Sequence, residues 1–240
     1  MTVSVCVPVY RAHDQPNVAT LAASVPGALD GLDGELVVAL NGIDAEHAGV
    51  PSEAVVVDLG INRGVAPGWN AAARAARGEI LVFANDDVLL GKGALAVIAN
   101  ALDEHPDAGV VGPVGANWDL SGPPREIESV DPHDAPVGEL HRCESVAGFL
   151  LACRREVFER IGGFDEHYAP CICEELDFCL AVRASGLNCY AIGGVIHEHE
   201  YSISKARPWT RLRHNGRTEM LWRIHRRNLR HFRRKWAGRA

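Results

Sequence analysis

The sequence contains no long apolar run, and none of its hydrophobic stretches approaches the roughly 20 residues that a membrane-spanning helix needs. The first residues, Met1 to Cys6, lack the basic region and apolar stretch of a secretory signal, so we expect them to begin a core strand. Hydrophobic residues make up 47% of the 240 positions, which is ordinary for a globular core. The length fits one large domain, or one domain with an appendage.

Closely spaced cysteines are also few. The seven cysteines cannot all pair within one chain, and several stand in apolar runs, where a free cysteine behaves as a small hydrophobe. This usage favours a reducing, cytoplasmic compartment. Cys171 and Cys173 lie close together, but no second close pair completes the tetrahedral spacing of a zinc site. A metal bound by these cysteines is therefore disfavoured.

Acidic residues are nearly absent from the last part of the chain. From Lys205 to the end there are 13 Lys and Arg but one acid, Glu219, which makes a net charge of +12. The other 204 residues carry 11 Lys and Arg and 30 Asp and Glu, a net charge of −19. Such an asymmetry marks an interaction surface on the basic part. We therefore divide the chain into a domain of residues 1–204 and a basic helical extension of residues 205–240.

Strands and helices alternate over the first half of the chain. Apolar, β-branched runs predict strands at residues 3–9, 35–40, 54–58, 79–84 and 109–113, with a late strand at 190–196. Helical patterns occupy residues 16–24, 67–77, 93–105, 154–161, 174–185 and 209–236. This order predicts a layered α/β fold with a mostly parallel, Rossmann-like central sheet flanked by helices. The stretch 115–137, rich in Pro, Gly and Asp, is expected to form a long loop or an edge hairpin over the site.

Two aspartates, Asp86 and Asp87, directly follow one apolar strand and precede further apolar residues. A carboxylate beside a hydrophobic core is costly unless something compensates it. A divalent cation such as Mg²⁺ or Mn²⁺, bound to a phosphate, would do so because these hard ions prefer oxygen ligands. The end of a strand in an open α/β sheet is also where ligands bind. A surface turn is the alternative, since Asn85-Asp86-Asp87 is good turn chemistry.

Polar groups follow the other early strands. Pro8 cannot donate to the sheet and opens the end of the first strand toward a ligand. Tyr10 can stack on a base or a ribose, and Asn41 follows the second strand; turn residues are the alternative for both. The run Asn62-Arg63-Gly64 precedes the Ala-rich helix, whose first N–H groups favour phosphate oxygens. Arg63 could add charge-assisted hydrogen bonds to a diphosphate, or be a plain surface arginine.

Acids and histidines gather in the second half. Glu174, Glu175 and Asp177 stand in the first turn of a predicted helix, where acids offset the helix dipole and have lowered pKa values. Packed together, however, like charges raise one another's pKa, as suits a general base. His197 and His199 alternate along a strand end, so they share one face. They fit either a metal site or a pair of surface histidines.

Six segments of the chain, which contain most of these residues, follow one another in a defined order. They are residues 3–11, 62–70, 84–88, 148–151 with 154–158 and 162–166, 174–179, and 197–202. In this order they resemble the motifs of the family 2 glycosyltransferases of the GT-A fold, especially a rhamnosyltransferase-like branch. Each motif alone is weak, and the six together are specific.

The resemblance implies a role for each matched position. Contacts to a nucleotide sugar fall on Pro8, Tyr10, Asn41, Asp44, Asn62, Arg63, Gly64, Asn70, Asn85, Asp86 and Ser202. Of these, Asp86 would contact the ribose or the sugar, and Ser202 would lie near a phosphate. Asp87 would bind the metal that bridges the two phosphates, with His197 completing the site and His199 as the fallback.

The same resemblance makes Glu175 the general base, with Glu174 and Asp177 as alternatives. Two departures from the family pattern stand out. Glu175 occupies a position where the family usually has Asp, and Asn41-Gly42-Ile43-Asp44 replaces a frequent Asp-Gly-Ser run. The second departure leaves the choice of nucleotide base open.

We therefore expect an enzyme, dependent on Mg²⁺ or Mn²⁺, that moves a sugar from a nucleoside-diphosphate sugar to a hydroxyl with inversion. The acceptor would be a glycan, a lipid-linked molecule or a small molecule. One alternative is a sugar-nucleotide nucleotidyltransferase, which would need a Gly-rich basic loop that is lacking at residues 10–13. The other is a non-catalytic module that binds sugar nucleotides or polyanions, although the carboxylate cluster argues against it.

The basic tail has its own apolar spacing. Leu221, Trp222, Leu229, Phe232 and Trp236 approximate one helix face among many cations. The first expectation is that this helix packs on the chain's own acidic body or on a partner subunit. Peripheral attachment to the anionic inner membrane face is the second. Nucleic acid is an unlikely partner because no recognition motif is present.

Overall fold

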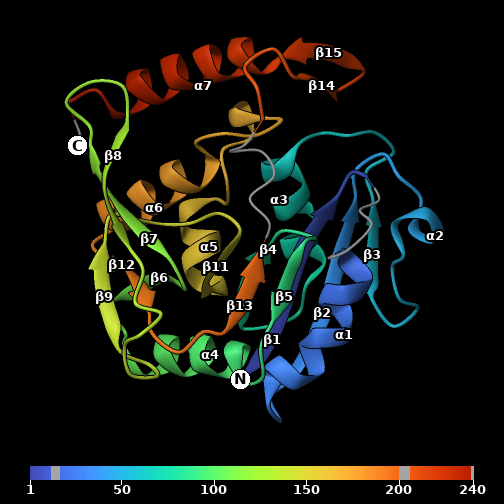
Figure 1. Ribbon diagram of the computed structural model, residues 1–240, viewed down its shortest axis with the longest axis vertical. Coiled ribbons are helices and arrows are strands. Elements are labelled where there is room, and N and C mark those ends of the chain that lie inside the picture. The colour runs from blue at the N-terminus through green and yellow to red at the C-terminus, as the bar shows by residue number, and fades with distance from the viewer. Residues whose placement is uncertain (12–16, 200–205, 239–240) are drawn as a thin grey trace.

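The computed structural model describes residues 1–11, 17–199 and 206–238. An eight-stranded sheet forms its centre, in the order β3-β2-β1-β4-β11-β6-β12-β9 (Figure 1). The strands are β1 (Thr2–Val9), β2 (Asp33–Leu40), β3 (Val55–Asp58), β4 (Ile80–Ala84), β6 (Ala108–Gly112), β9 (Leu140–Cys143), β11 (Leu150–Arg154) and β12 (Asn188–Ile192). β3, β2, β1 and β4 are parallel neighbours, whereas β11 runs antiparallel to β4 and β6. The predicted α/β class with a mostly parallel sheet is confirmed.

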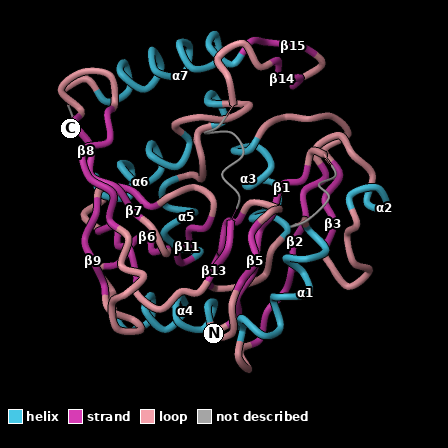
Figure 2. The backbone as a smooth tube through the Cα atoms, viewed as in Figure 1, coloured by secondary structure: helices cyan, strands magenta, loops and turns pink. Residues whose placement is uncertain are grey.

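Helices cover both faces of this sheet (Figure 2). α1 (Val18–Leu29) and α4 (Ala94–Glu104) cover one face, and α3 (Val65–Ala75), α5 (Arg155–Ile161) and α6 (Glu174–Ala184) cover the other. Alternation along β1 sends Val5 and Val7 into the first core and Cys6 into the second, together with Trp69. Burying each large aliphatic side chain stabilises the fold by roughly 1.5–3 kcal/mol, so this pattern holds each strand in register. All seven cysteines are buried and free, as expected of small hydrophobes.

The parallel strands β1 to β4 end at one edge of the sheet. The register pairs Val9 with Leu40, and Leu40 with Asp58. Across β4, Ala84 pairs with Leu150 at the start of β11. The residues that follow these strand ends therefore lie along a common edge, which is where an open α/β sheet binds ligands.

Smaller elements complete the body. β7 (Gly115–Asp119) and β8 (Arg125–Val130) form a hairpin that β10 (Ser145–Val146) extends, so of the two alternatives expected for residues 115–137, a long loop or an edge hairpin, the structure has the hairpin. β5 (Val88–Leu90) pairs with β13 (His197–His199), a pairing that the sequence did not indicate. The late strand was predicted too long, because β12 ends at Ile192 before a pair of glycines. Two short helices, α2 (Ala45–Ala48) and η1 (Glu166–Tyr168), stand outside the sheet.

The tail is only partly the helix that its composition predicted. Its first part is a hairpin of β14 (Arg211–His214) and β15 (Arg217–Met220), turning at Asn215-Gly216 with positive φ at both residues. α7 (Leu221–Trp236) follows and lies across the top of the molecule in Figure 1.

The predicted apolar face of α7 was wrong at one position. Trp222 is 45% exposed, whereas Ile224 and the polar Asn228 are buried beside Leu221 and Phe232. The reason is Asn228, whose carboxamide has hydrogen-bond partners in the body and so shifts the buried stripe.

Candidate active site

The paired aspartates lie where β4 ends, in the turn to β5. The backbone N–H of Asn85 donates to the Phe149 carbonyl at 2.9 Å, which ties this turn to the start of β11. Asp86 and Asp87 are buried, with exposed fractions of 8% and 5%. Burial, reinforced by the neighbouring charge of Asp87, raises the pKa of Asp86 to about 7. Two carboxylates in so little water need a cation or protons to be stable.

The short strand β13 brings a histidine to these carboxylates. Its pairing with β5 sets His199 opposite Val88, next to Asp87. The His199 Nε2 atom lies 3.2 Å from Asp87 Oδ1 and 3.2 Å from Asn85 Nδ2. His197 instead lies 2.9 Å from the Val195 carbonyl through Nδ1. The two imidazoles share a face as predicted, and Phe149 stacks on both.

The structure thus places His199 next to Asp87, the predicted metal ligand. His197 was the first choice to complete the metal site and His199 the second, so the order of the two is reversed. An imidazole lone pair and a carboxylate oxygen 3.2 Å apart repel unless a proton or a cation lies between them. Asp87 Oδ1 is buried and has no hydrogen-bond partner among the described residues. Carboxylate oxygen with imidazole nitrogen is a donor set that Mn²⁺ accepts, and Mg²⁺ accepts its oxygen part. The residues present therefore fit a divalent cation at this place.

A cavity of about 570 Å³ lies at the ends of β1 and β2, and Asp86, Asp87 and His199 are not among the residues that line it. Among the described residues it is lined by Pro8, Tyr10, Arg11, Asn41, Gly42, Gly60, Ile61, Asn62, Gly64, Val65, Pro170, Cys171 and residues 210–216. Five of the predicted donor-binding residues, Pro8, Tyr10, Asn41, Asn62 and Gly64, therefore share one cavity. Tyr10 is 38% exposed, and its pKa is raised by burial and by the charges of Asp86 and Asp87. Tyr10 thus connects the cavity with the acidic turn.

Asparagine side chains hold the inner wall of the cavity. Asn41 accepts a hydrogen bond from the Arg63 N–H at 2.8 Å and donates to the Gly64 carbonyl at 2.9 Å. Asn62 Oδ1 accepts from the Gly64 N–H, and the Val65 N–H donates to the Pro170 carbonyl. Three N–H groups at the start of α3 are therefore occupied within the protein. The sequence-based interpretation of this helix start as an open phosphate site does not hold for these three groups.

Other predicted donor contacts lie outside the cavity lining. The Asp44 side chain caps α2 and pairs with His47 at the surface. Asn70 is buried and bonds to both backbone groups of Phe164 and, through Nδ2, to Glu166. Arg63 is exposed. Nucleotide contacts by these three stay predictions, and Ser202 lies outside the described residues.

The acids of α6 separate into two environments. Glu174 is buried, and its Oε2 has no hydrogen-bond partner among the described residues. Burial and the neighbouring Glu175 raise the pKa of Glu174 well above its ordinary value, and burial raises the pKa of Glu175. The preceding Ile172 and Cys173 have φ values of 86° and 78°, a left-handed conformation that is strained for side-chain-bearing residues. For both glutamates, then, burial raises the pKa by more than the helix dipole lowers it.

Asp177 is an anchor for the tail. Its Oδ1 accepts from the Tyr168 hydroxyl at 3.0 Å and from the Trp236 indole at 2.8 Å, and Lys235 Nζ lies 2.7 Å from Oδ2. Asn228 donates to the carbonyls of Tyr168, Cys171 and Ile172, in the loop that leads into α6. The expectation that the tail helix packs on the chain's own acidic body is confirmed. A base role for Asp177 stays a prediction, with both of its oxygens already bonded.

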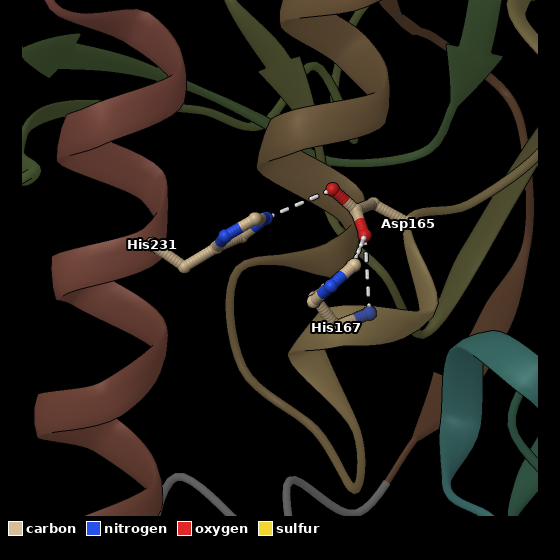
Figure 3. Close-up of side chains that lie close together, drawn as sticks. All are labelled: Asp165, His167 and His231. Atoms are coloured by element: carbon tan, nitrogen blue, oxygen red, sulfur yellow. Dashed lines mark hydrogen bonds and ion pairs between the residues drawn. The ribbon is translucent and has the colours of Figure 1, made fainter.

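A second group of metal-ligand types lies at the same interface, and the sequence did not single it out. Figure 3 shows Asp165 between His167, which follows it in η1, and His231 of α7. His167 Nδ1 lies 3.0 Å from Asp165 Oδ1, and His231 Nε2 lies 3.0 Å from Oδ2. Lys235 Nζ also reaches Oδ2 at 2.9 Å. Hydrogen bonds from His231, Lys235 and the His167 N–H outweigh burial and lower the pKa of Asp165.

Comparison with known proteins identifies the family of this chain. The profile of glycosyl transferase family 2 matches residues 4–162, which is more than half of the chain. The chain belongs to glycosyl transferase family 2. The matched region contains most of β1, all of β2 to β4 and the acidic turn. Glu174, Glu175, His197, His199 and the tail lie beyond it.

Curated relatives of this family 2 chain are much longer proteins. It is 30% identical over 156 residues to the O-antigen biosynthesis protein RfbC of Myxococcus xanthus, covering 57% of this chain and 12% of RfbC. It is 29% identical over 136 residues to the uncharacterized protein y4gI of Sinorhizobium fredii (strain NBRC 101917 / NGR234), covering 50% of this chain and 15% of y4gI. The chain thus spans less than a sixth of the length of these relatives.

Solved structures share the fold. GalNAc-T7, crystallised with UDP, GalNAc and Mn²⁺, superposes with a TM-score of 0.65 at 15% identity, covering 90% of this chain and 44% of GalNAc-T7. The mannosyltransferase PcManGT of Pyrobaculum calidifontis, in complex with GDP-Man and Mn²⁺, gives 0.54 at 20% identity, covering 81% and 55%. The Staphylococcus aureus TarS fragment 1–349 gives 0.54 at 19% identity, covering 79% and 57%. These likenesses show that the family 2 chain has the GT-A fold.

The sequence-based search missed the outer wall of the cavity. Pro170, Cys171 and the hairpin residues 210–216 line it, although they are far from the first strands in the sequence. The signal for the hairpin was present, because Asn215-Gly216 is the dipeptide that tight β-hairpins prefer. It was overridden by the basic, helix-like composition around it.

Proposed function

We propose that this chain is a metal-dependent, inverting glycosyltransferase that moves a sugar from a nucleoside-diphosphate sugar to an acceptor hydroxyl. One observation carries the proposal. Buried Asp86 and Asp87 stand with His199 at the edge where parallel strands end, and the charges of both aspartates act on Tyr10, which lines a cavity of about 570 Å³. Membership of glycosyl transferase family 2 supports the same reaction class.

Different residues of the chain have different roles in the transfer of the sugar. A divalent cation, Mg²⁺ or Mn²⁺, held by Asp87 and His199 would offset the negative charge that develops on the departing diphosphate. Tyr10, Asn41 and Asn62 hold the nucleoside part in the cavity. Asp86 orients the ribose or the sugar.

Glu175 acts as the general base. It accepts the proton of the acceptor hydroxyl while that oxygen attacks the anomeric carbon opposite the diphosphate, so the configuration inverts. The raised pKa of Glu175 supports this role, since a base with a pKa nearer neutrality takes up a proton more readily. Burial also raises the pKa of Glu174, and the neighbouring Glu175 adds to that rise, so Glu174 stays the alternative base.

The proposal extends to acceptor and location. The name of RfbC, an O-antigen biosynthesis protein, supports a saccharide acceptor and is compatible with the rhamnosyltransferase-like branch. The β7–β8 hairpin and the tail would select that acceptor. None of the described helices is long and apolar enough to cross a membrane. We propose that the chain works in the cytoplasm, with the exposed arginines of α7 able to meet an anionic inner membrane surface.

A donor screen tests this proposal. Release of nucleoside diphosphate from UDP-, GDP-, dTDP- and CDP-sugars would be measured with Mn²⁺ or EDTA, with and without saccharide acceptors. We expect release from one donor class only with metal, and none from Asp87→Ala. Asp134→Ala is the matched control, because that side chain is 92% exposed. Formation of a sugar nucleotide from a nucleoside triphosphate would indicate a nucleotidyltransferase, and binding without any turnover would indicate a binding module.

A further inference from the structure

The β14–β15 hairpin forms one wall of the nucleotide cavity, although it belongs to the tail. Residues 210–216 line the cavity opposite the ends of β1 and β2. This segment begins 48 residues beyond the end of the family match at residue 162. The hairpin is therefore a feature of this chain that the family match does not include.

Hydrogen bonds hold the hairpin in place over the cavity. The Asn215 N–H donates to the Asn62 carbonyl at 2.7 Å, and Asn62 Nδ2 donates to the Arg213 carbonyl at 3.0 Å. Behind it, His214 Nε2 and Arg227 Nη1 lie 2.8 Å and 2.7 Å from the same Glu219 oxygen. These contacts join the hairpin to the inner wall on one side and to α7 on the other. Asn62 bonds both to the hairpin and to the Gly64 N–H, so it links the two walls.

The charge of the lining suits an anionic ligand. Arg11, Arg211 and Arg213 line the cavity, and no described Asp or Glu does. Tyr10, Ile61 and Leu212 add flat or apolar surface. Cations around an apolar slot of this volume are the pattern expected for a ring-bearing anion such as a nucleotide.

We propose that the β14–β15 hairpin is a nucleotide-binding element, in which Arg211 and Arg213 hold the anionic nucleotide of the donor against the ends of β1 and β2. This inference rests on the proposed function. It gives the basic tail a direct part in donor binding, beyond its packing on η1 and α6. Removing either guanidinium should weaken binding roughly tenfold, as for one charge-assisted hydrogen bond.

Calorimetric titration with UDP, GDP, dTDP, CDP and ADP in the presence of Mn²⁺ tests it on the full chain. We expect one or more of these to bind, and Arg211→Ala and Arg213→Ala each to weaken that binding about tenfold. Arg217→Ala is the matched control: it removes an exposed arginine from the same hairpin that does not line the cavity, so its affinity should stay within about twofold.

The outcomes separate the two proposals. If both cavity variants bind as tightly as Arg217→Ala while Asp87→Ala loses binding, the hairpin inference is overturned and the proposed function stands. If the wild-type chain binds none of the five nucleotides, both are overturned. Circular dichroism confirms that each variant is folded.

Discussion

Two sites in this molecule combine a partly or fully buried aspartate with histidine, and they differ in what neutralises the charge. At the sheet edge, Asp87 lies 3.2 Å from His199 and directly follows another buried carboxylate, Asp86. At the tail interface, Asp165 lies 3.0 Å from His231 and 2.9 Å from the ammonium of Lys235. The first site concentrates negative charge, and the second already contains its cation.

The pKa values express this difference. The pKa of Asp86 is raised to about 7 by burial and by Asp87, whereas hydrogen bonds from His231 and Lys235 lower that of Asp165. A carboxylate that is bonded to an ammonium has little to gain from a metal, whereas two adjacent buried carboxylates, one raising the pKa of the other, would be stabilised by one. Ligand types in proximity therefore do not indicate a metal site by themselves; adjacent buried carboxylates are the stronger sign.

Substitution of the two aspartates tests this comparison most strongly. Asp87→Ala should lower Mn²⁺-dependent nucleotide affinity at least about a hundredfold while the chain stays folded, because it removes the proposed metal ligand. Asp165→Ala should leave that affinity within about threefold. Calorimetry with and without Mn²⁺ measures both, and equal losses in the two variants would contradict the assignment.

The acids of α6 offer a second contrast of the same kind. Glu175→Gln should lower kcat by roughly a hundredfold or more with little change in donor affinity, because the amide cannot accept the acceptor's proton. Asp177→Asn should mainly lower stability, because its amide group would face Lys235 or Trp236 with a donor instead of an acceptor. Steady-state kinetics and urea unfolding separate the two effects. A near-normal kcat in Glu175→Gln would move the base to Glu174.

Substitution of one histidine at each site tests the same comparison, with a smaller expected change in affinity. His199→Ala should weaken Mn²⁺ binding about tenfold, as expected for the loss of one ligand or its close support. His231→Ala should leave Mn²⁺ binding unchanged, because Lys235 already neutralises Asp165. Titration of Mn²⁺ followed by its paramagnetic resonance signal distinguishes them. A drop in stoichiometry for His231→Ala would show that the tail cluster is also a metal site.

The last prediction concerns acid stability. Because the folded pKa of Asp165 is lowered, its contribution is fully present above the ordinary aspartate pKa of about 4 and is lost as pH falls through the lowered folded value. Asp165→Asn should therefore cost about 1–3 kcal/mol near pH 7 and progressively less below pH 4. Urea unfolding across this range measures it, with Asp103→Asn on the exposed side of α4 as the control. A cost independent of pH would mean that packing, and not charge, is lost.

Local pattern was enough for much of the fold and part of the site. The strands β1, β2 and β4 are short apolar runs that are mostly buried, and the acidic turn follows β4 directly. Parallel strands align their ends, so the sequence predicts that Tyr10, Asn41, Asn62 and Asp86 lie along one edge of the sheet.

Partners distant in the chain could not be predicted in this way. β13 is three residues long, and only its pairing with β5 decides that His199, and not His197, faces Asp87. Likewise, the acids of α6 look alike in sequence, yet Lys235 and Trp236, 58 and 59 residues away, bond to Asp177 alone among the three.

The sequence by itself determined the α/β class, the parallel strands and the acidic residues at the end of β4, because alternation and burial of apolar side chains are local properties. Only the tertiary structure decided that the basic tail begins with a hairpin over the cavity, and that Asp165 and Asp177 serve as anchors for α7. Those outcomes depend on which distant groups form hydrogen bonds or ion pairs with each buried charge and N–H. These pairings are set by the complete tertiary structure and not by any local segment.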